Sequence, residues 1–222
     1  MSEPETAKQH YEQGLRAEDA RDRKMAIVEF RRAIELDPRH AEAYRQLGWN
    51  TYATGGALED ACRCLQTAIR LKPLIDDAHL YLGIVLNRLG KTAASEHHFR
   101  VALVLDDPAI THATFAEEFL WHNGRYGEAE GHFKKALMYD PDCVLALRDY
   151  ARMLACHGRN EEAKRLFDKA IEIDPDDRHT MRAFEEYRLG VMSADRDSYD
   201  RLRAAVERDP DYAEGIRRLK GK

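Results

Sequence analysis

The sequence is poor in the residues that build large apolar cores or covalent frameworks. Leu, Ile, Val and Phe together make up about a fifth of the 222 residues, and only four residues are cysteine. The first shortage predicts a core assembled from many small alanine contacts and some aromatic side chains. The second excludes a disulfide scaffold, because such scaffolds are dense in cysteine.

Other absences narrow the class of protein. No apolar run approaches the roughly 18 residues that a membrane span needs. The first ten residues, MSEPETAKQH, carry acids where a secretory signal needs bases and then an apolar stretch. A net charge of -5 and a sequence pI of about 6.1 argue against a nucleic-acid polycation. We therefore expect no membrane segment, and reduced thiols in the cytoplasm.

The prolines reveal an internal repeat. From Pro38 onward they fall at positions 38, 73, 108, 141, 175 and 210, so that successive gaps are 35, 35, 33, 34 and 35 residues. Each of these prolines follows an aspartate, except Pro73, which follows Lys72. A period near 34 residues indicates a repeat array.

Smaller motifs keep the same period. An alanine or serine, an aromatic or leucine, and an alanine recur at spacings of four and three, which places each trio on one face of a helix. Upstream of each later trio lies a turn signal that contains glycine, and seven residues before that stands a small residue or, in one repeat, Glu117. The trios are Ala26/Phe30/Ala33, Ala61/Leu65/Ala68, Ser95/Phe99/Ala102, Ala129/Phe133/Ala136 and Ala163/Phe167/Ala170.

These residues resemble the tetratricopeptide repeat (TPR) family, in which an aromatic residue, Leu-Gly, Tyr, Ala, Phe, Ala and Pro are spread over 34 residues. Tyr44 followed by Leu47, Gly48 and Tyr52 is a close match. The resemblance implies an all-α, right-handed superhelical solenoid of antiparallel helix pairs. It also implies that the chain binds other proteins rather than catalysing a reaction.

The periodicity predicts one solenoid domain over residues 7–210. A loose tail over 1–6 precedes it, and a short, basic capping helix over 211–222 follows it, because terminal repeats need a wetted outer face. The sixth repeat is degenerate, since it lacks the glycine turn. The predicted repeats span 7–40, 41–75, 76–109, 110–143, 144–177 and 178–211.

The first helix of each repeat is expected to line a concave groove in such a solenoid. The face opposite the Leu-Gly contact carries both tryptophans and several arginines, which are residue types that dominate binding hot spots. This pattern predicts a groove made of Tyr11, Arg45, Trp49, Tyr52, Tyr81, Ile84, Arg88, Phe115, Trp121, Arg148 and Arg152.

The arginines favour a partner with both acidic and apolar side chains, since guanidinium forks bind carboxylates at two points. Two alternatives stay open. Some of the aromatic side chains could pack between neighbouring first helices instead of facing a ligand. The arginines could pair with acids of adjacent helices, such as Asp149 or Glu118.

Ten histidines raise the question of a metal site. Cys64, His98 and His132 recur at one position of successive second helices, but helices packed roughly 8–10 Å apart cannot easily bring parallel side chains to one ion. Glu118 and His122 lie four residues apart, and two ligands do not make a site. We therefore predict no metal and no cofactor. The sequence also has no nucleophile motif and no Gly-rich phosphate loop, so we predict no enzyme activity.

Glu117 stands where other repeats carry Gly48, Gly83 or Ala151, at the tightest helix contact. A buried carboxylate is costly unless it is paired. Either the stack widens into a pocket beside Trp121, or the fourth repeat shifts so that Glu117 reaches solvent or an arginine.

The sequence therefore predicts an adaptor that holds a partner peptide, helix or domain in its groove. A regulatory or substrate-recruiting subunit of an enzyme complex is one alternative. Self-association through the degenerate sixth repeat is another.

Overall fold

The computed structural model describes residues 6–75, 77–105 and 108–189. Within these ranges the chain is helical, without strands, and its helices form five pairs followed by a further helix. This confirms the predicted all-α fold of helix pairs. The tail over 1–5, the second half of the sixth repeat and the capping helix over 211–222 lie outside the described residues, so these remain predictions.

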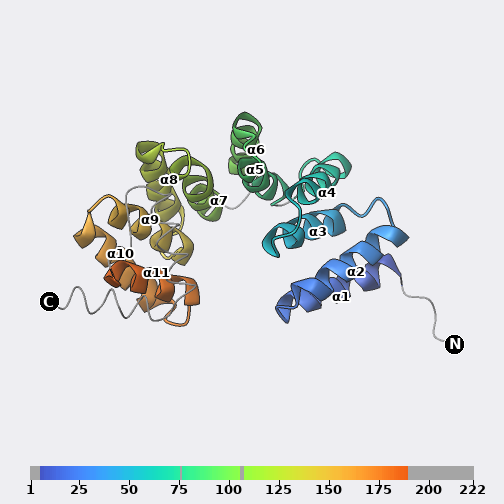
Figure 1. The fold of residues 1–222 in the computed structure, drawn as a ribbon, viewed down its shortest axis with the longest axis horizontal. Helices are drawn as coiled ribbons and strands as arrows, with labels where there is room; N and C mark the ends of the chain where they lie inside the picture. The colour runs from blue at the N-terminus through green and yellow to red at the C-terminus, as the bar shows by residue number, and fades with distance from the viewer. Residues whose placement is uncertain (1–5, 76, 106–107, 190–222) are drawn as a thin grey trace. The chain divides into compact units, whose positions relative to one another are not determined.

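The chain divides into two compact units, Met1–Asp107 and Pro108–Lys222, called the N-terminal and C-terminal units below. The single domain over 7–210 stays a prediction, because each unit is described by itself. The helices of the N-terminal unit are α1 (Ala7–Asp19), α2 (Arg23–Leu36), α3 (Ala41–Ala53), α4 (Leu58–Leu71), α5 (Ala78–Arg88) and α6 (Thr92–Leu105) (Figure 1).

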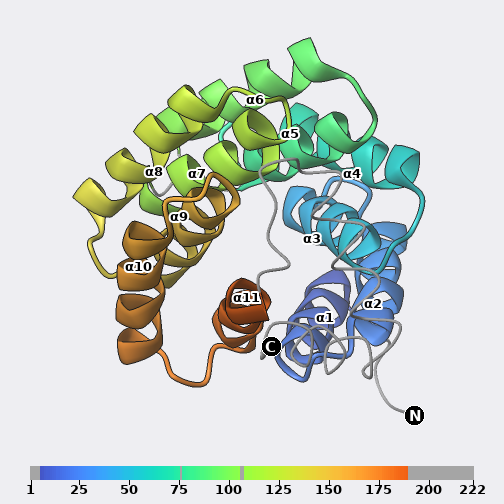
Figure 2. The same cartoon turned by 60° about the vertical axis from the view of Figure 1, so that its left-hand side comes forward.

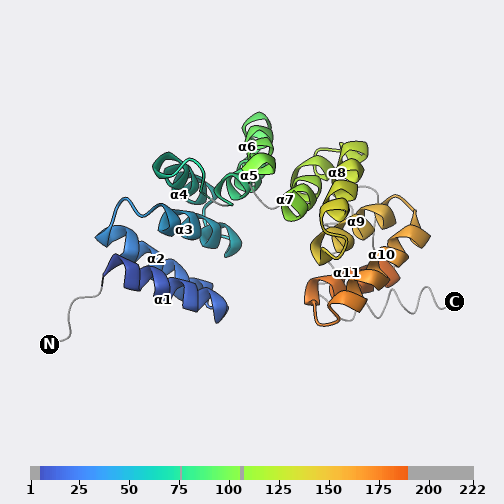
Figure 3. The ribbon, with the colours of Figure 1, turned by 180° about the vertical axis from the view of Figure 1, so that it is seen from behind.

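The C-terminal unit continues the alternation of first and second helices. Figures 2 and 3 show its helices from two further directions. They are α7 (Pro108–Thr114), η1 (Phe115–Trp121), α8 (Tyr126–Tyr139), α9 (Val144–Cys156), α10 (Asn160–Ile173) and α11 (Arg178–Leu189). In the described ranges no helix is both long and apolar enough to span a membrane.

The core of each pair is the trio predicted on the second helix. In α2, Ala26, Phe30 and Ala33 are completely buried, and the later trios are buried in the same way. Phe30 packs with Leu47 of the next first helix, and Leu65 and Phe167 pack in the same way with Leu82 and Ala183, so these trios join their own pair to the following helix of the same unit. The part of the core contributed by the second helices is thus built from small residues around one large side chain per repeat.

Glycines end the first helix of repeats two to five as predicted. Gly55, Gly90, Gly124 and Gly158 all have φ between 71° and 75°. Residues with a Cβ adopt this left-handed conformation at a cost, which is why glycine stands there. The backbone N–H of the next residue closes the turn, for example from Lys91 to the Leu86 carbonyl at 2.9 Å.

A second set of glycines permits the close contact inside a pair. A Cβ built on Gly48 would lie 2.7 Å from Cγ of Leu65, and one on Gly14 would lie 2.5 Å from the Phe30 ring. Since contacts this short do not occur, these positions bring the two helix backbones too close for a larger residue.

The fourth repeat departs from this plan. Pro108 opens α7, whereas Pro38 and Pro141 lie in the turns between helices. Proline is tolerated there because the first N–H of a helix has no partner within it. The first helix then widens into the π-helix η1. This irregularity accompanies the shortest proline gap, that of 33 residues.

Candidate functional site

The eleven side chains predicted to line a groove separate into exposed and buried sets. Arg88 is exposed, while Tyr11, Arg45, Trp49, Tyr52, Tyr81 and Arg148 are half-buried. The other four are buried and do not line an open surface, which corrects the prediction for Ile84, Phe115, Trp121 and Arg152.

Each buried side chain has a local reason. Ile84 belongs to a run of five consecutive buried residues in α5, from Leu82 to Leu86. Phe115 packs on Phe119 and edge-on to His132, with ring centroids 5.4 and 4.9 Å apart. Trp121 lies beneath the guanidinium of Arg152, 5.5 Å from its ring centroid.

Five side chains of the N-terminal unit form a continuous row on α3 and α5, here called the ladder: Arg45, Trp49, Tyr52, Tyr81 and Arg88. Trp49 stacks on Tyr81 with ring centroids 4.3 Å apart and planes 17° apart, and it also packs on Tyr52 at 5.5 Å. Arg88 Nε donates to the Tyr52 hydroxyl at 3.4 Å. The aromatic residues therefore do pack between neighbouring first helices, yet they keep part of their surface exposed.

One end of the ladder is held by acid contacts. Arg45 and the Tyr81 hydroxyl both donate to Oδ2 of Asp77, at 3.4 and 3.3 Å. Tyr11 of α1 adjoins this end, and burial raises the pKa of its phenol although Arg45 lowers it. The first helices α1, α3 and α5 are thereby joined by polar and aromatic side chains.

Two arginines of the C-terminal unit, Arg148 and Arg152, share a buried carboxylate. Arg148 binds Asp149 through Nε and Nη2 at 3.0 and 2.9 Å, and Arg152 binds the same carboxylate at 2.9 Å. Burial alone would raise the pKa of Asp149, but the two guanidiniums outweigh it and hold that pKa below its ordinary value. Arg148 also reaches Asp177, at 3.7 Å. The pairing of arginines with nearby acids, left open on sequence grounds, is what the structure shows.

The position of Glu117 decides between the two alternatives that its sequence position left open. Its carboxylate is buried and lies 3.5 Å from Nη1 of Arg152. The fourth repeat therefore shifts and Glu117 meets an arginine, which was the second of the two expectations. The π-helix also brings Glu117, Glu118 and His122 together, with one potential ligand atom from each lying within 4.8 Å of the others.

Two histidine pairs were missed by the sequence argument. His79 and His98 approach at 3.0 Å between Nδ1 atoms, and His112 and His132 at 2.7 Å. Burial, together with the neighbouring histidine, lowers the pKa of His98 and of His132 to about 4. The sequence did contain a signal for these pairs. In two successive repeats, a histidine of the first helix is followed 19 or 20 residues later by a histidine of the second helix.

Two family models match the sequence. Residues 50–110 match one model described as tetratricopeptide repeat, and residues 120–183 match another with the same description. Together the two segments account for more than half of the chain. The chain belongs to the tetratricopeptide repeat family. No curated relative matches it in sequence.

Solved structures agree on the fold. TTC0263, a thermophilic TPR protein of Thermus thermophilus, is 19% identical and superimposes with a TM-score of 0.72 over 83% of this chain and 98% of its own. PilW, a widely conserved type IV pilus biogenesis factor, is 18% identical with a TM-score of 0.70 over 96% and 97%. YrrB, described as a TPR protein with an unusual peptide-binding site, is 23% identical with a TM-score of 0.52 over 81% and 92%. At these identities the likeness shows the fold.

Proposed function

We propose that this chain is a non-enzymatic scaffold that binds a partner peptide, helix or domain on the first helices of its N-terminal unit. Membership of the TPR family supports an interaction role in general. The peptide-binding site ascribed to YrrB supports a peptide or extended segment as the bound element.

The ladder is the observation that carries this proposal. Trp, Tyr and Arg are the residue types that contribute most to protein interfaces, and here they stand side by side on α3 and α5. The Trp49–Tyr81 stack fixes both rings before a partner arrives. Less side-chain freedom is then lost on binding than at a flexible surface.

The partner's chemistry follows from the ends of the ladder. Exposed Arg88 favours a carboxylate, and the half-buried rings of Trp49 and Tyr52 favour an apolar or aromatic side chain beside it. We do not include Arg148 and Arg152 among the residues that contact the partner, because their guanidiniums already bind buried Asp149. Nucleic acid does not fit the net charge of -5, and a cytoplasmic location remains part of the proposal.

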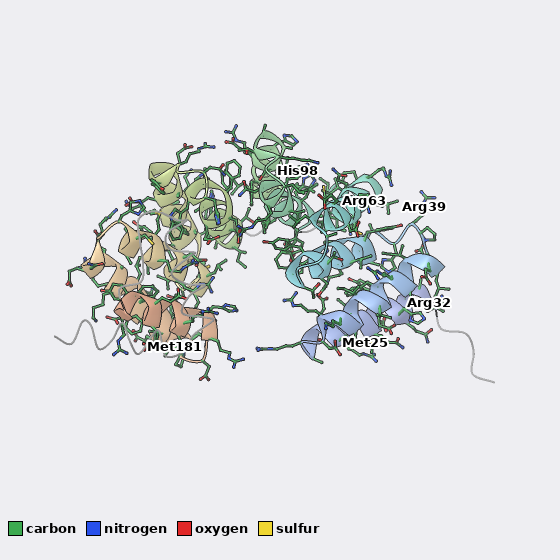
Figure 4. All side chains as sticks on the ribbon, in the orientation of Figure 1. Met25, Arg32, Arg39, Arg63, His98 and Met181 are labelled. Carbon is green, nitrogen blue, oxygen red and sulfur yellow. The ribbon has the colours of Figure 1, made fainter. Side chains whose placement is uncertain are left out.

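The test is a comparison of three variants with wild type. Trp49→Ala removes the central ring, Arg88→Glu reverses the ladder's exposed charge, and Arg63→Glu reverses another exposed charge, on α4 (Figure 4). Each protein is used as bait in lysate, and any partner is then purified and its affinity measured. We expect Trp49→Ala to weaken binding by at least roughly 30-fold, Arg88→Glu to weaken it as well, and Arg63→Glu to leave it unchanged.

If one partner binds all four proteins equally, the ladder is not its binding site. The same preparations separate the alternatives. A self-assembling array sediments as oligomers when pure, with a concentration dependence that the ladder variants do not alter. A recruiting subunit instead captures an enzyme from the lysate, and the Trp49→Ala variant binds that enzyme as tightly as wild type does.

A further inference from the structure

Glu117, Glu118 and His122 come together because of the π-helix. A π-turn closes between residues five apart, whereas an α-turn closes between residues four apart. Glu117 and His122 are five apart and therefore align along η1 and its C-cap, with Glu118 beside them. One potential ligand atom from each residue lies within 4.8 Å of the other two. Ordinary helical spacing aligns only Glu118 with His122.

The imidazole of His122 is oriented by its own helix. Its Nδ1 lies 2.8 Å from the backbone carbonyl oxygen of Glu117. A carbonyl can only accept, so Nδ1 carries the proton and Nε2 is left with the lone pair. Histidines that bind metals commonly have one nitrogen held in this way by a carbonyl or carboxylate, which fixes the tautomer and the direction of the ring.

Glu117 is a buried carboxylate in a charged environment. The carboxylate is buried, and Arg152 approaches it at 3.5 Å while lying closer to Asp149, at 2.9 Å. Arg152 therefore contacts both Glu117 and Asp149. A buried carboxylate is stabilised by pairing or by coordinating a metal, and Glu118 adds a second negative charge.

We propose that Glu117, Glu118 and His122 form a binding site for a divalent transition-metal ion of the zinc class. Two carboxylate oxygens and one imidazole nitrogen suit such ions, whereas magnesium and calcium prefer oxygen alone. Donor atoms that share one zinc ion at about 2.1 Å lie about 3.4 Å apart in a tetrahedral site. Binding therefore requires the donor atoms to move closer together than the 4.8 Å limit within which they lie here, and it leaves a fourth position for water.

The test is a titration of the chelator-treated full chain with Co²⁺, followed by its visible absorption, and with Zn²⁺ by calorimetry. We expect one tight site, which weakens by at least about tenfold in Glu118→Gln and in His122→Ala. The matched control is His157→Ala. His157 also stands at the C-cap of a first helix, and its Nδ1 lies 2.8 Å from the backbone carbonyl oxygen of Met153. Its replacement by alanine should leave the metal affinity unchanged.

A second control separates this site from the histidine pairs. The double variant His98→Ala/His132→Ala disrupts both pairs and should retain the tight site. The proposal is wrong if that variant loses the site, or if Glu118→Gln binds Co²⁺ and Zn²⁺ like wild type. Because Glu118→Gln preserves the shape of the side chain, it decides the question even where circular dichroism shows that His122→Ala is unfolded.

Discussion

Arg45 and Arg148 occupy the same position of the second and fifth repeats, yet their surroundings differ. Each reaches forward to an aspartate just before the next first helix, Asp77 at 3.4 Å and Asp177 at 3.7 Å. Arg45 stands among half-exposed aromatic rings, whereas Arg148 shares buried Asp149 with Arg152. The register of the repeat thus determines the direction of the side chain, and its neighbours determine whether it faces a ligand or an internal acid.

The largest expected effect comes from replacing the aspartate that each arginine contacts, Asp149 in the C-terminal unit and Asp77 in the N-terminal unit. Asp149→Asn leaves buried Arg152 and half-buried Arg148 without their shared carboxylate, and we expect a loss of about 3–5 kcal/mol in the free energy of unfolding. Asp77→Asn removes a more exposed acid, and the loss should stay within about 1 kcal/mol. Urea unfolding followed by circular dichroism measures both. Equal losses would show that burial does not distinguish the two arginine sites.

The second prediction compares glycines of the two units. Gly14→Ala places a Cβ 2.5 Å from buried Phe30 and should destabilise the protein by about 1–3 kcal/mol. Gly131→Ala, within α8, meets nothing within 4 Å and should stabilise it by about 1 kcal/mol through helix propensity. Thermal unfolding of the two variants gives the signs. A stabilising Gly14→Ala would refute the close contact between α1 and α2.

The third prediction concerns acid, and each unit contributes one histidine pair. The pKa values of His98 and His132 fall from 6.5 to about 4 on folding. Between these values the unfolded chain binds more protons, so stability is lost as the pH falls from about 6.5 toward 4. The loss is at most about 1.4 kcal/mol per pH unit for each histidine, and smaller because the rings are half-buried.

Melting temperatures measured from pH 7 to pH 4.5 test this expectation. His98→Gln alone and His132→Gln alone should each flatten the curve in part, and the double variant should flatten it further. A double variant that melts as steeply with acid as wild type would contradict the role of the pairs.

The smallest effect is spectroscopic. Trp121 is 1% exposed, while Trp49 is half-buried on the ladder. The variant Trp49→Phe retains only Trp121 and should emit at shorter wavelength and resist quenching by acrylamide. Trp121→Phe retains only Trp49 and should show the opposite behaviour. Similar quenching in both variants would remove the distinction between an exposed and a buried tryptophan.

Much of the fold could be predicted because its local rules repeat. The buried trios, the glycine turns and the close contact at Gly48 all follow from spacing within one helix pair. The candidate site was predicted less completely. Trp49, Tyr52 and Tyr81 do form a cluster, but the sequence placed Trp121 and Arg152 on an open face where the structure buries them.

The fourth repeat shows why the rest of the candidate site could not be predicted from the sequence. A helical period of 3.6 residues assigns Glu117 and His122 to different faces, and the π-helix Phe115–Trp121 changes that period over only seven residues. Within it, the buried carboxylate of Glu117 lies 3.5 Å from Arg152 of the next repeat, a contact that helix periodicity does not predict.

The sequence by itself determined the family, the repeat length and the buried trios, because these depend on residues close together in the chain. Only the tertiary structure decided which tryptophan is accessible, which arginines are paired within the protein, and which histidines meet. These properties depend on contacts between side chains of different helices. The periodicity of a single helix carries no information about the distances between such side chains.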